Sequence, residues 1–100
     1  MLERMSPMSD LTYFRSSSVR SQSIDTGFLL YDLRDRKGYL LNATAEILWR
    51  MLDEHPHLDD LVGAFCDRFP EVKPDVMRVD LRRTLENLEG RGLVRAMLDS

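Results

Sequence analysis

The sequence has one cysteine, no long apolar run and no excess of positive charge. A single cysteine excludes an internal disulfide and is typical of a reducing compartment. No apolar run approaches the ~18 residues that a membrane span needs. The segment 1–10 also lacks the apolar core of a secretory signal. These absences predict a cytoplasmic protein that makes no use of a membrane.

The charge balance argues against a nucleic-acid-binding role. The chain carries 14 basic and 17 acidic residues, for a net charge of −3. A DNA-binding domain usually shows a basic excess, so the balance favours a protein or small-molecule partner. With 100 residues, 43% of them hydrophobic, the chain suits a single domain with one modest core.

Motifs for catalysis, phosphate binding or metal binding are lacking. Gly90-Arg91-Gly92 follows a helix, whereas phosphate loops lie between a strand and a helix. Cys66 belongs to an apolar stripe, where a thiol is usually inert. His55 and His57 flank a proline and match no zinc-ligand spacing. We therefore expect no enzyme, no metal and no cofactor.

The first half of the chain has the pattern of a small sheet. Residues 1–18 show little periodicity and are interpreted as a loose arm, although Tyr13 and Phe14 could pack on the domain or on a partner. Short turns separate the apolar segments that follow, which favours an antiparallel meander whose last strand lies at an edge. The predicted strands are 19–24, 28–33 (apolar on both faces, typical of a central strand) and 39–41.

Three amphipathic helices are predicted after the strands. Asn42 is a good N-cap, Pro56 and Pro70 end the first and second helices, and Pro74 begins the third. Gly90 and Gly92 end the third helix, and 93–94 can return as a short closing segment. The fold class is therefore α+β: a three-stranded antiparallel sheet followed by three helices, with the domain spanning 19–96.

The third helix has a second, partly apolar face. At 100° per residue, Val76, Val79, Arg83 and Glu86 lie roughly opposite its core stripe. Two valines on a charged face could line a groove. They could equally be scattered surface residues, which are normal on a solvated helix, and the pattern alone leaves both interpretations open.

Several segments together resemble the pyrroloquinoline-quinone biosynthesis protein D (PqqD) family. The resemblance covers about 19–94, and its parts are specific in this order and spacing rather than singly. They are YLLN at 39–42, AEILW at 45–49, LVGAF at 61–65, and Asp80, Leu85 and Leu88 before GLV at 92–94.

The resemblance implies a winged helix-turn-helix-like domain without catalysis of its own. Such domains bind the leader of a ribosomally made precursor peptide and present it to a modifying enzyme, such as a radical S-adenosylmethionine enzyme or a lasso-peptide protease. The leader would add a strand to 37–41, in a groove against the third helix. The expected peptide-binding residues are Lys37, Gly38, Tyr39, Leu40, Leu41, Val76, Val79, Arg82 and Arg83.

Two questions stay open at this point. A winged-helix DNA-binding regulator is the alternative function, although the arginines of the third helix alternate with Asp80, Glu86 and Glu89. The chain could also act as a monomer or a homodimer.

Overall fold

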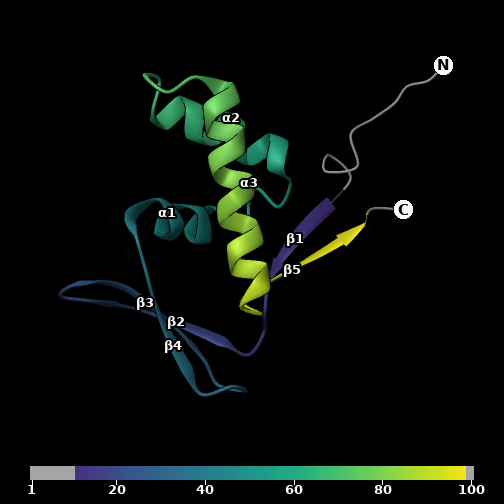
Figure 1. Ribbon diagram of the computed structural model, residues 1–100. Helices are drawn as coiled ribbons and strands as arrows, with labels where there is room; N and C mark the ends of the chain where they lie inside the picture. Colours follow the sequence, from purple (N-terminus) through teal and green to yellow (C-terminus); the bar gives the residue numbers. More distant parts are fainter. Residues whose placement is uncertain (1–10, 99–100) are drawn as a thin grey trace.

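The computed structural model describes residues 11–98, which form two small sheets and three helices (Figure 1). The expected three strands followed by three helices are confirmed, and a pair of terminal strands is added to them. In chain order the elements are β1 (Leu11–Arg15), β2 (Val19–Ile24), β3 (Gly27–Asp32), β4 (Lys37–Leu41), α1 (Ala43–Met51), α2 (Leu58–Arg68), α3 (Pro74–Gly90) and β5 (Val94–Leu98).

The larger sheet is an antiparallel meander in the order β2-β3-β4. β3 is central, as expected, but only one of its faces is buried. Phe28 and Leu30 point into the core, whereas Tyr31 is 38% exposed. The helices pack on one side of this sheet, so the apolar residues on the other face of β3 stay partly exposed. The other side exposes Leu40 and Ile24 as well.

The loose arm expected over 1–18 is wrong for its described part. Residues 11–15 form β1, which pairs antiparallel with β5, with Tyr13 opposite Ala96. Tyr13 is 2% exposed, and its N–H donates to the carbonyl of Pro56 over 2.8 Å. The partner strand lies at the other end of the chain, so no local pattern marks β1. Residues 1–10 lie outside the described part.

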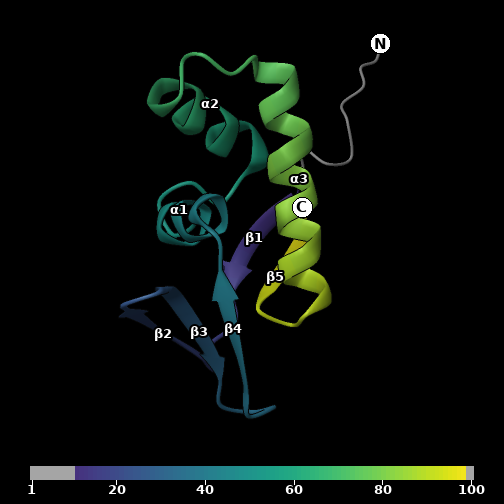
Figure 2. The same ribbon diagram turned by 60° about the vertical axis from the view of Figure 1, so that its left-hand side comes forward.

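The helices begin where their caps predict and enclose the core. Asn42 Oδ1 accepts a hydrogen bond of 2.8 Å from the Ala45 N–H at the start of α1. α3 begins at Pro74 and packs along α2 and β5 (Figure 2). Its stripe of Leu81, Leu85 and Leu88 is buried. One face of α3 therefore packs on the core, while the opposite face is exposed.

A buried carboxylate holds the turn between β3 and β4. Asp32 is inaccessible to solvent, and its Oδ1 accepts from the Ser18 hydroxyl at 2.8 Å and the Arg34 N–H at 2.9 Å. The Ser18 hydrogen bond, helped by backbone N–H groups, lowers the pKa of Asp32. Arg36 takes the left-handed conformation (φ 58°), and its N–H donates to the Asp32 carbonyl. The turn therefore directs β4 along the free side of β3.

Candidate functional site

β4 forms a free edge of the larger sheet within the described residues. The hydrogen-bond register follows from one contact: the Leu33 N–H donates to the Ser18 carbonyl, on the β2 side. The main-chain N–H and C=O groups of successive residues point to opposite sides of a strand. Because Leu33 bonds to the β2 side, the odd-numbered residues of β3 bond to β2 and the even-numbered ones bond to β4. Leu30 faces Tyr39 in the register. Consequently Gly38 and Leu40 direct their N–H and C=O groups to the open side.

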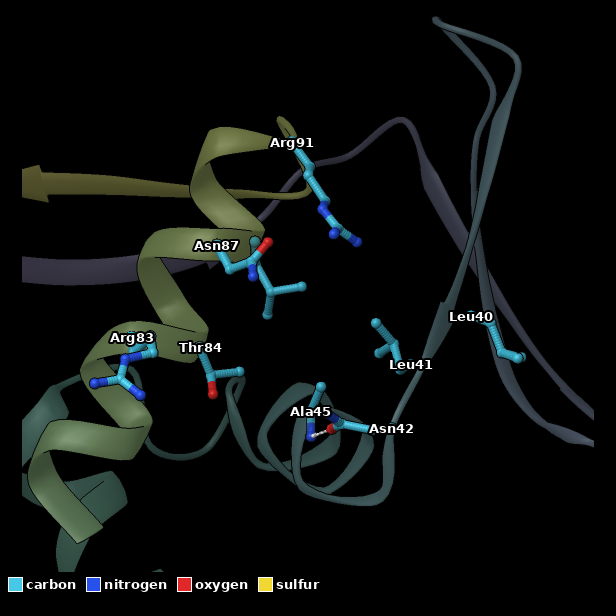
Figure 3. Close-up of a pocket in the computed structure, with 9 residues that line it drawn as sticks. Leu40, Leu41, Asn42, Ala45, Arg83, Thr84, Asn87 and Arg91 are labelled. Carbon is cyan, nitrogen blue, oxygen red and sulfur yellow. Dashed lines mark hydrogen bonds between the residues drawn. The ribbon is translucent and has the colours of Figure 1, made fainter. Parts of the chain in front are cut away.

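Side chains on β4 alternate between the helices and the exterior. Leu41 is 7% exposed and Tyr39 is half-buried, and both lie on the side of the sheet that packs against the helices. Leu40 points away from them (Figure 3) and is 56% exposed. Gly38 is part of the strand rather than of the turn, opposite Tyr31. A peptide added to β4 would therefore meet main chain at its edge and an apolar wall toward the helices.

A pocket of about 360 Å³ lies between β4, the start of α1 and the second half of α3 (Figure 3). β4 and α1 contribute mainly apolar side chains, whereas α3 contributes polar and cationic ones. Its lining residues are Leu40, Leu41, Asn42, Ala45, Arg83, Thr84, Asn87, Leu88 and Arg91. Such a pocket can take one side chain of an added strand and hydrogen-bond its polar end.

Arg91 spans the opening between α3 and β4. Its guanidinium carbon lies 5.4 Å from the centre of the Tyr39 ring, a cation–π contact. Within residues 11–98, neither Arg91 nor Arg83 makes an ion pair. By contrast, Arg78 pairs with Asp59 at 2.6 Å and ties α3 to α2.

The structure brings some of the expected site residues together and separates others. Residues 37–41 and Arg83 border the edge or its pocket. Val76 and Val79 are about half exposed on the first half of α3 and do not line it. Arg82 lies toward Tyr13. Burial raises the pKa of Tyr13, the negative charges of Glu89 and Glu86 raise it further, and the positive charge of Arg82 lowers it. Arg82 therefore belongs to the flank of α3 that faces β1.

Sequence reasoning missed the polar wall of the pocket. Thr84, Asn87 and Arg91 were not among the expected site residues, although Arg83, Asn87 and Arg91 recur at four-residue spacing and so share a helix face. α3 ends at Gly90, as expected, and Arg91 is its C-cap. Arg91 therefore still lies one turn beyond Asn87, beside the pocket.

Other kinds of site find no support in the described residues. No group of three His, Cys, Asp or Glu side chains between residues 11 and 98 could hold a metal ion. Across the same range, no helix is long and apolar enough to cross a membrane. Cys66 is half-buried rather than fully buried.

The fold and the groove define a small α+β domain with a free strand edge beside a helix, an arrangement suited to binding an extended peptide. The model of the family described as coenzyme PQQ synthesis protein D (PqqD) matches residues 27–94. The chain therefore belongs to the PqqD family. Members of this family are peptide-binding domains without catalysis of their own.

Two solved structures share the fold over most of the chain. One is TbiB1 in complex with the TbiA(beta) leader peptide, with 27% identity over 81% of this chain and 93% of that chain, at a TM-score of 0.73. The other is lasso peptide synthetase B1 complexed with the leader peptide. It has 24% identity over 84% of this chain and 98% of that chain, at a TM-score of 0.72. No curated protein matched the sequence.

Proposed function

We propose that this protein binds the leader of a ribosomally made precursor peptide by strand addition at β4. The free edge of β4 beside the α3 pocket carries the proposal. Main-chain hydrogen bonds from Gly38 and Leu40 would give affinity, and the pocket would fix the register. Similarity to TbiB1, which was solved with a leader peptide, supports the same use here.

The bound leader would then be presented to a modifying enzyme. A radical S-adenosylmethionine enzyme or a lasso-peptide protease fits the role, because a domain without catalysis of its own must deliver its peptide elsewhere. The chain would act as a monomer or a homodimer. We place the recognition domain at 11–98 rather than 19–96, because β1 pairs with β5 and buries Tyr13.

A fluorescence-polarisation titration tests the function. The labelled leader of a precursor encoded beside this gene should bind tightly, whereas a random DNA duplex should not, because the net charge is −3. Tight, salt-sensitive duplex binding without leader binding would instead establish the winged-helix regulator.

A further inference from the structure

The α3 wall of the pocket is positively charged, unlike the chain as a whole. The lining includes two cations, Arg83 and Arg91, and no acidic side chain. The chain as a whole is acidic, with a net charge of −3. The positive charge beside β4 is therefore local, and it lies where an added strand would place its side chains.

Both guanidiniums are available to a ligand. Neither is engaged in an ion pair within the described residues. The cation–π contact with Tyr39 holds Arg91 across the opening, and leaves its N–H donors free to bind a planar anion. Arg83 and Arg91 are eight residues apart, about 12 Å along the helix axis, so they flank the pocket from both ends.

Neutral donors lie between the two arginines. The Asn87 amide and the Thr84 hydroxyl line the same wall (Figure 3). The Thr84 hydroxyl already donates to the Asp80 carbonyl at 2.9 Å, so the Asn87 amide is the stronger candidate to donate to a ligand. Leu41, Ala45 and Leu88 form an apolar floor. This combination suits a short aliphatic chain that ends in a carboxylate.

We propose that the pocket selects peptides with a carboxylate on the strand face directed at α3, bound by Arg91, whose guanidinium points toward β4, while Arg83 adds positive charge at the other end of the pocket (Figure 3). The inference rests on the proposed function, because it names the side chain that fixes the leader in register. Asp and Glu side chains and a peptide C-terminus share this chemistry. Charge-assisted hydrogen bonds from the Arg91 guanidinium, with the positive charge of Arg83 nearby, would make the preference larger than that of an exposed ion pair.

Selection from an mRNA-displayed library of random linear peptides tests the proposal. The C-termini of displayed peptides are blocked, so a carboxylate can come only from Asp or Glu. Wild-type protein should enrich an acidic residue at one fixed position of the selected peptides. The double variant Arg83→Glu/Arg91→Glu should enrich Lys or Arg there. Arg95→Glu, on the exposed part of β5, is the control for altered charge and should select as the wild type does.

Synthetic forms of one selected peptide separate the two carboxylate sources. Replacing its Asp or Glu by Asn or Gln should weaken binding to the wild type by about tenfold, with no such loss for the double variant. Amidating the C-terminus should change nothing. A loss on amidation together with no loss on the isosteric change would overturn the side-chain assignment.

The outcomes also distinguish this inference from the proposed function. If selected peptides require β4 but show no acidic preference, the carboxylate pocket is wrong and strand addition stands. If the wild type enriches no peptide at all, both proposals fall. Circular dichroism of each variant confirms that it is folded before its selection is interpreted.

Discussion

Among residues 11–98, the larger sheet has two free edges, β2 and β4, and each borders a groove that contains arginines. Beside β2, a groove of about 420 Å³ includes Arg15 and Arg50. Arg15 pairs with Asp53 at 3.3 Å, donates to the Trp49 carbonyl at 2.6 Å and lies over the Trp49 ring. Within residues 11–98, the arginines beside β4 make no ion pair, although Arg91 lies over the Tyr39 ring.

The second arginine of the β2 groove is engaged in the same way. Arg50 pairs with Glu46 at 3.1 Å and lies 4.6 Å from the centre of the Phe28 ring. Both edges have unpaired main-chain groups, so an open edge alone does not select a partner. The comparison teaches that side-chain charge left unpaired, rather than an open edge, distinguishes the proposed binding groove beside β4 from the groove beside β2.

The largest effect should come from a core residue whose truncation destabilises the whole domain, including both edges of the sheet. Leu85 is inaccessible to solvent in the core beneath α3. Leu85→Ala should lower the free energy of unfolding by about 2–5 kcal/mol and so weaken binding at either edge. A urea titration measures the loss. Val79→Ala, at an exposed position of the same helix, should change it by less than about 0.5 kcal/mol. Equal losses for both variants would show that α3 packs differently.

Matched prolines on the two strands test which edge pairs with the peptide. Leu40→Pro removes an N–H that points to the open side of β4 and should weaken leader binding by about tenfold or more. The same alternation points the Ser21 N–H to the open side of β2, so Ser21→Pro should leave affinity unchanged. Calorimetry on both folded variants would make the comparison. A loss confined to Ser21→Pro would move the site to β2.

Asp32 joins the two edges, because it binds Ser18 before β2 and the turn that leads into β4. A carboxylate whose pKa is lower in the folded than in the unfolded protein stabilises the fold at every pH above its ordinary pKa, here 3.8. This stabilisation is lost as the pH falls through the lowered pKa of the folded state. Asp32→Asn should therefore lower the Tm at pH 7, and the difference from wild type should shrink below pH 3.8.

Thermal melts across this acid range, with Asp35→Asn as the control for charge, check the prediction. Asp35 is an exposed residue of the same turn. A difference in Tm that stays constant down to the lowest pH would show that the Asp32 carboxylate is not the stabilising group.

The sequence predicted features that depend on local rules. Asn42 caps its helix, Pro70 follows the end of α2, and Pro74 begins α3, because caps and φ restrictions act within a few residues. The expected end of the first helix at Pro56 was wrong, because α1 already ends at Met51. β1 was missed because its partner, β5, lies at the far end of the chain. For the site, the edge strand was predicted from the order of the elements. The pocket wall was not, because which flank of α3 faces β4 depends on how the helix packs.

The smallest effect should distinguish the two flanks of α3. Arg82 and Arg83 are neighbours in sequence, but Arg83 lines the pocket and Arg82 lies toward Tyr13. Arg83→Glu should reduce leader affinity and its dependence on salt. Arg82→Glu should change leader affinity by less than about twofold, because the half-buried Arg82 side chain lies toward Tyr13 and does not line the pocket.

Calorimetry with the leader alone, and then with the modifying enzyme present, separates the possible roles of Arg82. An effect of Arg82→Glu that appears only with the enzyme would assign that flank to the enzyme. Equal losses of leader affinity for both reversals would mean that the peptide extends over the exposed valine of residue 79 as well. The charge difference between the two flanks would then have no part in selecting the peptide.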